Sequence, residues 1–330
     1  MAAGSPARAR DLTALHMPLD PYAKRFLDRL AALNPPSALS LSVAERREAL
    51  ANLLSLSAGD APEAAVEDRI IPGPGGALTV RFYTPGGESR SPLPALIYFH
   101  GGGLVAGTLD TYDGIARELA HASGCRLLSV GYRLAPEAPF PAAVEDACAA
   151  TEWIAAHAAD FGVDPTRICV AGDSAGATLA AVVCQDAAGK GLPLALQVLL
   201  CPILDHAGAT ASRRAFAEGY LVDSATLEHD LKHYLGTTGN VHDPRVSPLR
   251  GSELGGLPPT CIHTAEFDPL CDEGTEYAER LRAAGVRTLY RCHLGMIHLF
   301  YGMGTLIPYA ANAYQIIGND IRAMLAGNPS

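Results

Sequence analysis

The five residues Gly172-Asp-Ser-Ala-Gly176 join two segments of different periodicity. An apolar run at residues 168–171 precedes them, and a helical pattern at residues 175–188 follows directly. A serine at such a sharp strand-to-helix turn takes a strained backbone conformation and needs small neighbours at both glycines. Because both flanking segments are present, we prefer this interpretation to one in which Ser174 only caps the helix. The sequence therefore predicts that Ser174 is a nucleophile above the carboxyl edge of a sheet.

A second motif, His100-Gly-Gly-Gly103, ends the apolar run at residues 93–99. Successive glycines cost backbone entropy, so a loop keeps them where the backbone takes unusual angles or approaches another group closely. In lipases and esterases this motif supplies oxyanion donors, joined by the N–H group after the nucleophile. A phosphate cradle is the alternative, but its usual glycine patterns are absent. We expect Gly102, Gly103 and Ala175 to donate to an oxyanion.

The acid of a triad built on this turn follows the serine along the chain. A predicted strand leads into a carboxylate-rich loop, in which Asp268 precedes Pro269 and a predicted helix. Proline fixes the backbone beside Asp268, which favours this residue over Glu266 and Asp272. Asp272 and Glu273 are expected to serve the N-terminus of the following helix instead. Asp268 is the predicted catalytic acid.

The base is sought after the last predicted strand, residues 288–292. His298 lies in a loop just before a helical tail, whereas His293 lies at the strand end. His293 is expected to be a satisfied histidine at the edge of the sheet. The order serine, acid, histidine is the order this type of triad takes along the chain. His298 is therefore the predicted general base.

Apolar runs and helical patterns alternate through most of the chain. After an alternating segment at residues 77–84, apolar runs lie at residues 93–99, 127–130, 168–171, 194–200, 260–264 and 288–292. The helical patterns between them occupy residues 112–122, 142–158, 175–188 and 273–284. Strands apolar on both faces, alternating with helices, form parallel sheets covered on both sides. The expected class is α/β, with a mostly parallel central sheet and helices on both faces.

Two further regions are expected to form a helical cap. Residues 21–33 form one amphipathic pattern, and a second helix begins at Ser42, whose S-x-x-E capping box closes with Glu45. We assign residues 1–60 to the N-terminal part of the cap and residues 61–330 to the catalytic domain. Residues 205–249 separate two strands with a polar, partly helical stretch. Because structureless loops of this length are uncommon in compact domains, they are predicted to be a helical insertion that contributes to the cap.

Charge and hydropathy exclude several classes of partner. The net charge of −10 includes no basic block or stripe, so nucleic acid is excluded as the main partner. No apolar stretch approaches the roughly 18 to 20 residues that span a bilayer, and residues 1–20 contain no apolar signal segment. We expect a soluble, cytoplasmic protein without a membrane span.

The eight cysteines and one histidine pair are candidates for disulfides, metal ligands or reactive thiols. The cysteines are scattered through apolar runs without CxxC or metal-binding spacing, which favours free thiols in a reducing compartment. Cys271 stands out because it follows the predicted acid by three residues. His229 and His233 have the helical spacing of two metal ligands, but the neighbouring Asp230 and Lys232 favour a solvated helix face.

Taken together, the motifs resemble those of the hormone-sensitive-lipase-like esterases, also called bacterial family IV, of the α/β-hydrolase superfamily. The resemblance extends from about Leu93 to Phe300 and is carried by His100–Gly103, Tyr132–Glu137, Phe140–Ala143, Gly172–Gly176, Asp268–Leu270 and Gly295–His298. It implies the α/β-hydrolase fold, a cap over the active site, short acyl chains, no metal or cofactor, and a possible homodimer formed through a sheet edge.

The same resemblance assigns structural roles and marks two departures. Asp173 and His100 are expected to support the site, and residues 132–137 to hold the loop packing beneath it. Leu104 stands where an aromatic residue often follows the glycines, and Leu299 where a glycine often follows the histidine. Both departures bear on the shape of the acyl pocket and leave the triad intact.

The expected activity is hydrolysis of short-chain carboxylic esters through an acyl-enzyme. The substrate is then a small molecule. The same triad also suits amides, lactones or carbamates. A ligand-binding receptor on this fold is a third possibility, but such relatives usually lose a triad member. An interaction protein would instead expose a large apolar patch.

Overall fold

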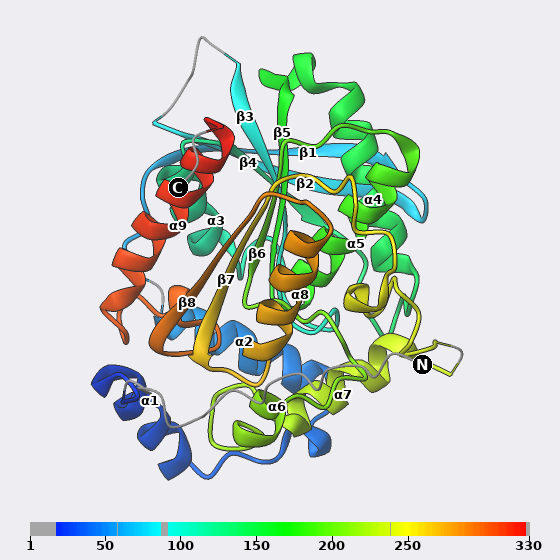
Figure 1. Ribbon diagram of the computed structural model, residues 1–330. Helices are drawn as coiled ribbons and strands as arrows, with labels where there is room; N and C mark the ends of the chain where they lie inside the picture. The colour runs from blue at the N-terminus through cyan, green and yellow to red at the C-terminus, as the bar shows by residue number, and fades with distance from the viewer. Residues whose placement is uncertain (1–17, 58, 87–91, 238, 328–330) are drawn as a thin grey trace.

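A central eight-stranded sheet organises the computed structural model (Figure 1), which describes residues 18–57, 59–86, 92–237 and 239–327. Its order is β1-β2-β4-β3-β5-β6-β7-β8. The pairs β1·β2 and β2·β4 are antiparallel, and every later pair is parallel. The strands are β1 (Ala64–Gly73), β2 (Gly76–Pro85), β3 (Leu93–Phe99), β4 (Arg126–Gly131), β5 (Val163–Asp173), β6 (Leu196–Leu200), β7 (Thr260–Phe267) and β8 (Thr288–Ile297).

Helices cover both faces of the sheet, as the α/β prediction requires (Figure 1). One face carries α3 (Asp113–Ser123) and α9 (Tyr309–Leu325), and the other carries α4 (Ala142–Ala156), α5 (Ala175–Lys190) and α8 (Cys271–Ala283). Buried apolar side chains form a separate cluster on each face. The fold is therefore the three-layer α/β-hydrolase arrangement.

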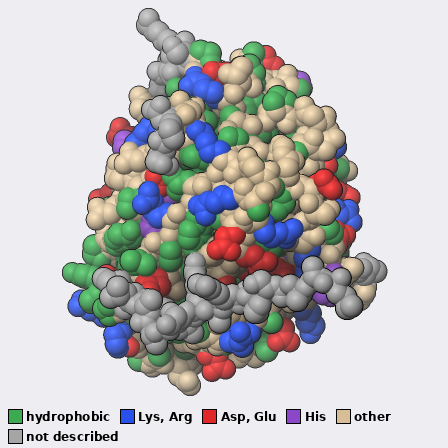
Figure 2. All heavy atoms as spheres, viewed as in Figure 1, with side chains coloured by type: hydrophobic (Ala, Val, Ile, Leu, Met, Phe, Trp, Pro, Cys, Tyr) green, Lys and Arg blue, Asp and Glu red, His purple; other side chains and the backbone are tan. Residues whose placement is uncertain are grey.

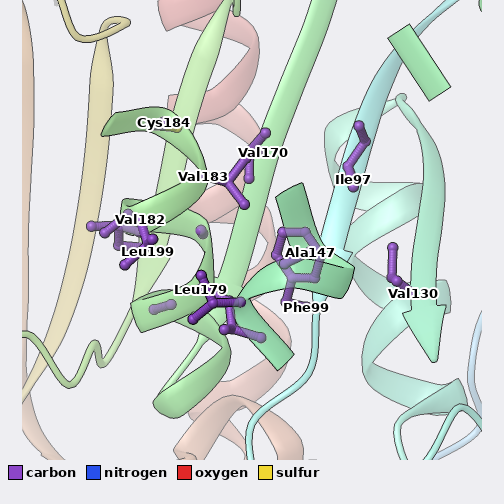
Figure 3. Packing of buried hydrophobic residues seen from close by; sticks show 14 of the residues in the cluster. Ile97, Phe99, Val130, Ala147, Val170, Leu179, Val182, Val183, Cys184 and Leu199 are labelled. Atoms are coloured by element: carbon purple, nitrogen blue, oxygen red, sulfur yellow. The ribbon is translucent and has the colours of Figure 1, made fainter. Parts of the chain in front are cut away.

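The central strands are buried on both sides, which explains their uniformly apolar sequence. All five residues of β6 are buried, and so is the stretch of β5 from Ile168 to Asp173. Figure 3 shows part of one layer, where Val170 of β5 lies near Val183 of α5. Full burial of a valine or leucine side chain contributes roughly 1.5 to 3 kcal/mol, so these layers dominate the stability of the domain.

Four helices gather at the end of the sheet where the parallel strands terminate (Figure 1). They are α1 (Pro21–Ala32), α2 (Val43–Ser57), α6 (Ala211–Ala215) and α7 (Ser224–Leu235). The predicted capping box is present, because Ser42 N donates to Glu45 Oε2 at 2.8 Å and Glu45 N donates to Ser42 Oγ at 3.3 Å. Residues 1–17 and 58, which belong to the predicted cap segment 1–60, lie outside the described residues.

Short 3-10 helices complete the elements: η1 (Ala38–Ser40), η2 (Ala158–Phe161), η3 (Pro248–Arg250) and η4 (Phe300–Gly302). No helix in the described parts of the chain has the length and apolar character needed to cross a bilayer. On the face shown in Figure 2, basic and acidic side chains are interspersed.

The structure corrects the limits of the last strand. β8 ends at Ile297, so it is five residues longer than the predicted run that ends at residue 292. The added residues include Leu294, which is 55% exposed, and Gly295. Such residues break an apolar run, and they lie in the irregular stretch between the pairs Ala265–His293 and Phe267–Ile297. The longer strand delivers the chain directly to His298.

Candidate active site

The turn between β5 and α5 holds Ser174 in the left-handed region, with φ 53° and ψ −120°. A side chain rarely adopts this conformation, so the neighbours must enforce it. A Cβ atom on Gly172 would lie 2.2 Å from the carbonyl oxygen of Gly176, and one on Gly176 would lie 2.0 Å from that of Phe99. Only glycine fits at either position, which explains the Gly-x-Ser-x-Gly pattern.

The three predicted side chains form one hydrogen-bonded chain. His298 Nε2 lies 3.0 Å from Ser174 Oγ, and His298 Nδ1 lies 2.7 Å from Asp268 Oδ2. The other carboxylate oxygen of Asp268 accepts from Leu270 N at 2.9 Å. Asp268 is fully buried and His298 is 4% exposed, so solvent barely competes for these bonds. The geometry is that of a serine activated by an oriented imidazole.

The electrostatics of His298 favour a base that holds its proton more tightly than usual. Burial acts to lower its pKa, but the charge of Asp268 and the hydrogen bond to it act in the opposite direction, as does the charge of Asp173. The net result is a raised pKa. An imidazole tuned in this way accepts the serine proton readily and is stabilised as imidazolium.

The predicted oxyanion donors surround the serine. Gly102 and Gly103 have φ values of 108° and 68°, and both line the cavity that contains Ser174 and His298. In the described chain, the N–H groups of Gly102 and Gly103 donate to no protein acceptor. Ala175 is the first residue of α5, where backbone N–H groups have no partner inside the helix. These N–H groups are therefore able to donate hydrogen bonds to an oxygen atom that gains negative charge.

Asp173 and His100 are bound beneath the site, which agrees with structural roles. Tyr98 and Tyr301 donate to the two carboxylate oxygens of Asp173 at 2.6 and 3.2 Å. Burial nevertheless raises the pKa of Asp173 to about 6. Tyr132 donates to the carbonyl oxygen of His100 at 2.6 Å, and the two rings stack at 4.5 Å.

The rival carboxylates have other partners. Glu266 accepts from Gly295 N at 2.7 Å and so fixes the strand that precedes the histidine loop. Asp272 and Glu273 lie in the first turn of α8, as expected, but no side chain caps this helix. Asp272 accepts from Ser212 N at 2.8 Å, and buried Glu273 accepts from Arg213 Nε at 2.6 Å. Both carboxylates therefore also bind the segment after β6.

His293, the rival base, lies away from the serine. Its Nε2 is 3.0 Å from His263 Nδ1, and its Nδ1 is 3.0 Å from the hydroxyl of Tyr309. Burial lowers its pKa to about 4, so the ring is neutral near pH 7. It is a satisfied buried histidine.

A cavity opens above the serine. Its walls come from the oxyanion loop, from α2 and from the segment after β6. Six aliphatic side chains line it, together with polar ones: Leu50, Ile203, Val222, Leu227, Leu231 and Leu299. A concave site that combines apolar walls with a few polar groups is typical of sites for small organic ligands.

Five polar residues of this cavity were not predicted from the sequence: Arg46, Tyr112, His206, Thr226 and Asp230. It predicted a solvated face for the helix segment that contains His229 and Asp230, and this prediction is wrong. His229 is 4% and Asp230 is 5% exposed, because this face of α7 turns toward α2. Arg46 lies 184 residues from Asp230 in sequence, so no local pattern signals the pair that they form.

Two buried groups bring cysteine, histidine and carboxylate atoms within reach of one ion: Cys201, Asp268 and His298, and Cys261, His263 and Asp320. In the first group, Asp268 and His298 already bind one another. In the second, Arg291 holds both oxygens of Asp320 at 2.8 and 3.0 Å. A metal ion would have to displace these partners.

None of the eight cysteines, all of which lie in described segments, forms a disulfide. The Sγ atoms of Cys271 and Cys292 lie 4.0 Å apart, and Cys271 is 8% exposed. Its interaction with Cys292, together with burial, raises the pKa of Cys271. A thiol in this state is a poor nucleophile, so proximity to Asp268 does not make Cys271 reactive.

The two departures from the family pattern share an unusual backbone. Leu104 has φ 61° and Leu299 has φ 59°, and both side chains are buried. The left-handed region costs a residue with a Cβ atom roughly 1 to 2 kcal/mol. The glycine usual after the histidine would avoid this cost, whereas Leu299 adds an apolar wall to the cavity.

Comparison with known proteins extends these observations. A family model described as alpha/beta hydrolase fold matches residues 96–302. The chain is 44% identical over 268 residues to the carboxylic ester hydrolase LipN of Mycobacterium tuberculosis, covering 79% of this chain and 71% of the relative. It is 35% identical to the ethyl acetate hydrolase of Pseudomonas putida, over 84% of this chain and 88% of that one. A solved structure of an α/β hydrolase from the metagenome of Lake Arreo, Spain, superposes with a TM-score of 0.90 at 38% identity, covering 93% and 99% of the two chains.

Proposed function

This chain belongs to the hormone-sensitive-lipase-like branch of the α/β-hydrolase family and is a serine carboxylic ester hydrolase, and we propose that Ser174, His298 and Asp268 are its catalytic triad. The single observation that carries the assignment is the hydrogen-bonded order Asp268, His298, Ser174, with distances of 2.7 and 3.0 Å. Ser174 lies on a turn in which only glycine fits at positions 172 and 176. Asp268 thus binds the Nδ1 side of His298, and the Nε2 side of His298 faces the hydroxyl of Ser174.

In the acylation half-reaction, Ser174 Oγ attacks the ester carbonyl carbon while His298 Nε2 takes the hydroxyl proton. The carbonyl oxygen becomes an oxyanion that accepts hydrogen bonds from the N–H groups of Gly102, Gly103 and Ala175. The bond to the alcohol oxygen then breaks, and His298 returns the proton to that oxygen. The products are a free alcohol and an acyl group on Ser174.

In the second half-reaction, water attacks the acyl carbon and gives a proton to His298. The bond to Ser174 Oγ breaks, the serine recovers its proton, and a carboxylic acid leaves. Asp268 keeps the proton of the neutral imidazole on Nδ1, so that Nε2 is able to accept the serine proton. It also stabilises the imidazolium. The raised pKa of His298 supports this role.

We propose that the substrates are small esters with short acyl chains. Six aliphatic side chains line the cavity beside Ser174, which suits a short acyl group and a small alcohol. The relative named ethyl acetate hydrolase supports the same substrate class. Helices α1, α2, α6 and α7 would act as a cap over this cavity.

Labelling and turnover together test the triad. A fluorophosphonate is expected to label the wild-type protein once, at Ser174. Turnover of nitrophenyl acetate or butyrate should exceed that of a long-chain nitrophenyl ester. Ser174→Ala should remove labelling and turnover while the melting temperature stays near that of wild type. Ser212→Ala is a matched control that should keep both. A folded wild-type protein that neither labels nor turns over would reject the proposal.

A substrate panel separates ester hydrolysis from its neighbours. Amides, lactones and carbamates present the same carbonyl to the same triad, but amides have a poorer leaving group. We expect the highest kcat/KM with esters. Preferential turnover of any other acyl bond would reassign the physiological reaction.

We also propose cytoplasmic residence and a homodimer. The eight cysteines form no disulfide, which supports a reducing compartment, and titration of the denatured protein should find eight thiols. In the described sheet β8 is an outer strand beside β7, and its Leu294 is 55% exposed. A dimer joined through this edge would be dissociated by Leu294→Glu in analytical ultracentrifugation.

A further inference from the structure

A bidentate ion pair joins α2 to α7 beside the oxyanion loop. Arg46 Nε and Nη2 lie 3.1 and 2.8 Å from the two carboxylate oxygens of Asp230. Their side chains are only 13% and 7% exposed. Both residues line the same cavity as Ser174 and His298. A nearly buried pair of charges therefore stands in the cavity where the reaction would develop its own negative charge.

The Asp230 carboxylate contacts the oxyanion loop directly. A Cβ atom on Gly103 would lie 2.0 Å from Asp230 Oδ2 and 2.5 Å from Asp230 Cβ. The aspartate thus occupies the space that a side chain at position 103 would fill. Gly103 also has φ 68°, which favours glycine for a second reason. Asp230 supports the backbone turn that presents the Gly103 N–H group.

This arrangement creates an electrostatic problem. A carboxylate at this position repels an oxyanion held by the neighbouring N–H groups, and repulsion between charges is strong where water is scarce. The guanidinium of Arg46 binds both carboxylate oxygens and remains protonated at any pH used for assay. The pair as a whole has little net charge.

We propose that Arg46 is a positioning residue that neutralises Asp230, so that the carboxylate holds the Gly103 turn without repelling the oxyanion. The proposal rests on the proposed function of the Ser174 site. It goes beyond that function because it assigns an electrostatic role to two helices outside the triad.

Three other titratable side chains lie near Asp230. His229 Nδ1 lies 3.0 Å from Asp230 Oδ1, while its Nε2 lies 3.2 Å from the carbonyl oxygen of Leu41. A neutral imidazole has one N–H group and donates to only one of these acceptors. The His233 ring lies 4.6 Å from the His229 ring, and Tyr112 is close enough for the charges of Arg46 and Asp230 to act on its pKa. Arg46 is the permanent cation of this group.

The test is a double-mutant cycle with nitrophenyl acetate at pH 8. Arg46→Met should lower kcat roughly tenfold to a hundredfold, with a smaller change in KM, because it leaves the carboxylate unneutralised. Asp230→Asn keeps the shape without the charge and should cost less. The double variant should recover most of the activity lost in Arg46→Met. Arg46→Lys should stay close to wild type, because it restores the positive charge without the planar fork.

The split between kcat and KM is a readout that a purely structural clasp would not reproduce. The double variant should recover kcat more than KM, because the amide of Asp230→Asn carries no charge that would repel the oxyanion. Arg291→Met, which opens the Arg291–Asp320 pair between β8 and α9, is the matched control and should keep kcat. Melting temperatures check that each variant is folded.

The outcomes separate the two proposals. Additive losses in the double variant, or an Arg46→Lys variant as slow as Arg46→Met, would overturn the electrostatic role. Should Arg46→Met fail to fold, the comparison of Arg46→Lys with the double variant still decides. Inactivity of the folded wild-type protein would instead reject the proposed function.

Discussion

The Nδ1 atom of His298 lies 2.7 Å from Oδ2 of Asp268, and the two side chains are 4% and 0% exposed. A hydrogen bond to a carboxylate is short and strong, and here little water competes with it. It fixes the ring orientation, so that Nε2 faces Ser174 Oγ at 3.0 Å. The acid therefore controls both the direction and the proton affinity of the base.

Replacement of Asp268 by asparagine should lower kcat by about 10⁴ without unfolding the protein. The amide has nearly the same shape, but its NH₂ group favours the tautomer in which Nε2 carries the proton. Steady-state turnover of nitrophenyl acetate and a thermal melt measure the two quantities. Asp272→Asn, which alters the carboxylate bound to Ser212 N, is the matched control and should lose less than tenfold. Equal losses in both variants would contradict the assignment of the acid.

Activity should fall on the acid side with an apparent pKa above the ordinary value of 6.5, because that of His298 is raised. Protonated His298 has no lone pair to accept the serine proton, so kcat/KM declines as the pH drops through this pKa. Residual turnover in Asp268→Asn should show an acid limb at lower pH, since the raising charge is gone. A pH series of kcat/KM measures both limbs. An unshifted limb would show that another group titrates.

The buried carboxyl of Asp173 should make stability depend on pH. Its pKa is about 6 in the folded protein against an ordinary 3.8, so the folded state binds the proton more tightly. The resulting stability is fully present below pH 3.8 and is lost as the pH rises through about 6. The free energy of unfolding of wild type relative to Asp173→Asn should therefore fall by on the order of 2 to 3 kcal/mol between pH 4 and pH 8.

Urea unfolding of both proteins across this range measures the difference. Tyr98→Phe supplies an internal check, because the hydrogen bond from Tyr98 lowers the pKa of Asp173. Without it, the stability loss should continue to higher pH. If the difference in the free energy of unfolding between wild type and Asp173→Asn does not change with pH, the pKa of Asp173 is not raised by folding.

Glycine should be tolerated better than alanine at position 299. Leu299 is 5% exposed, so Leu299→Ala loses roughly 2 to 4 kcal/mol of packing and keeps the left-handed strain. Leu299→Gly loses the same packing but releases about 1 kcal/mol of strain. Leu179, buried within α5, should show the reverse order, because glycine weakens a helix by about 1 kcal/mol relative to alanine. Urea unfolding of the four variants decides the order at each site.

The central strands and helices were predictable because they are buried on both faces. The run at residues 93–99 has the limits of β3, since its last five residues are buried and alternate between the two apolar layers. β1 carries no comparable signal. Glu67, Asp68 and Arg69 interrupt it, and most of its residues are exposed, because it pairs only with β2 at the edge of the described sheet.

The order of Ser174, Asp268 and His298 was readable because each follows a strand that ends at the same edge of the sheet. The Arg46–Asp230 pair was not readable, for a physical reason. Charged residues on a helix predict a solvated face, whereas the carboxylate of Asp230 in α7 is bound by Arg46 of α2, which lies 184 residues away in the sequence. Long-range pairing of this kind leaves no local pattern in the sequence.

Four aliphatic side chains of the cavity wall come from two segments that lie outside the strands of the sheet. Residues 18–57 precede β1, and residues 205–249 leave after β6 and return before β7; neither supplies a strand among its described residues. Directed evolution can therefore randomise Leu50, Val222, Leu227 and Leu231 without touching a strand or a triad residue. Libraries built this way would search for new ester preferences while inheriting an unaltered reaction.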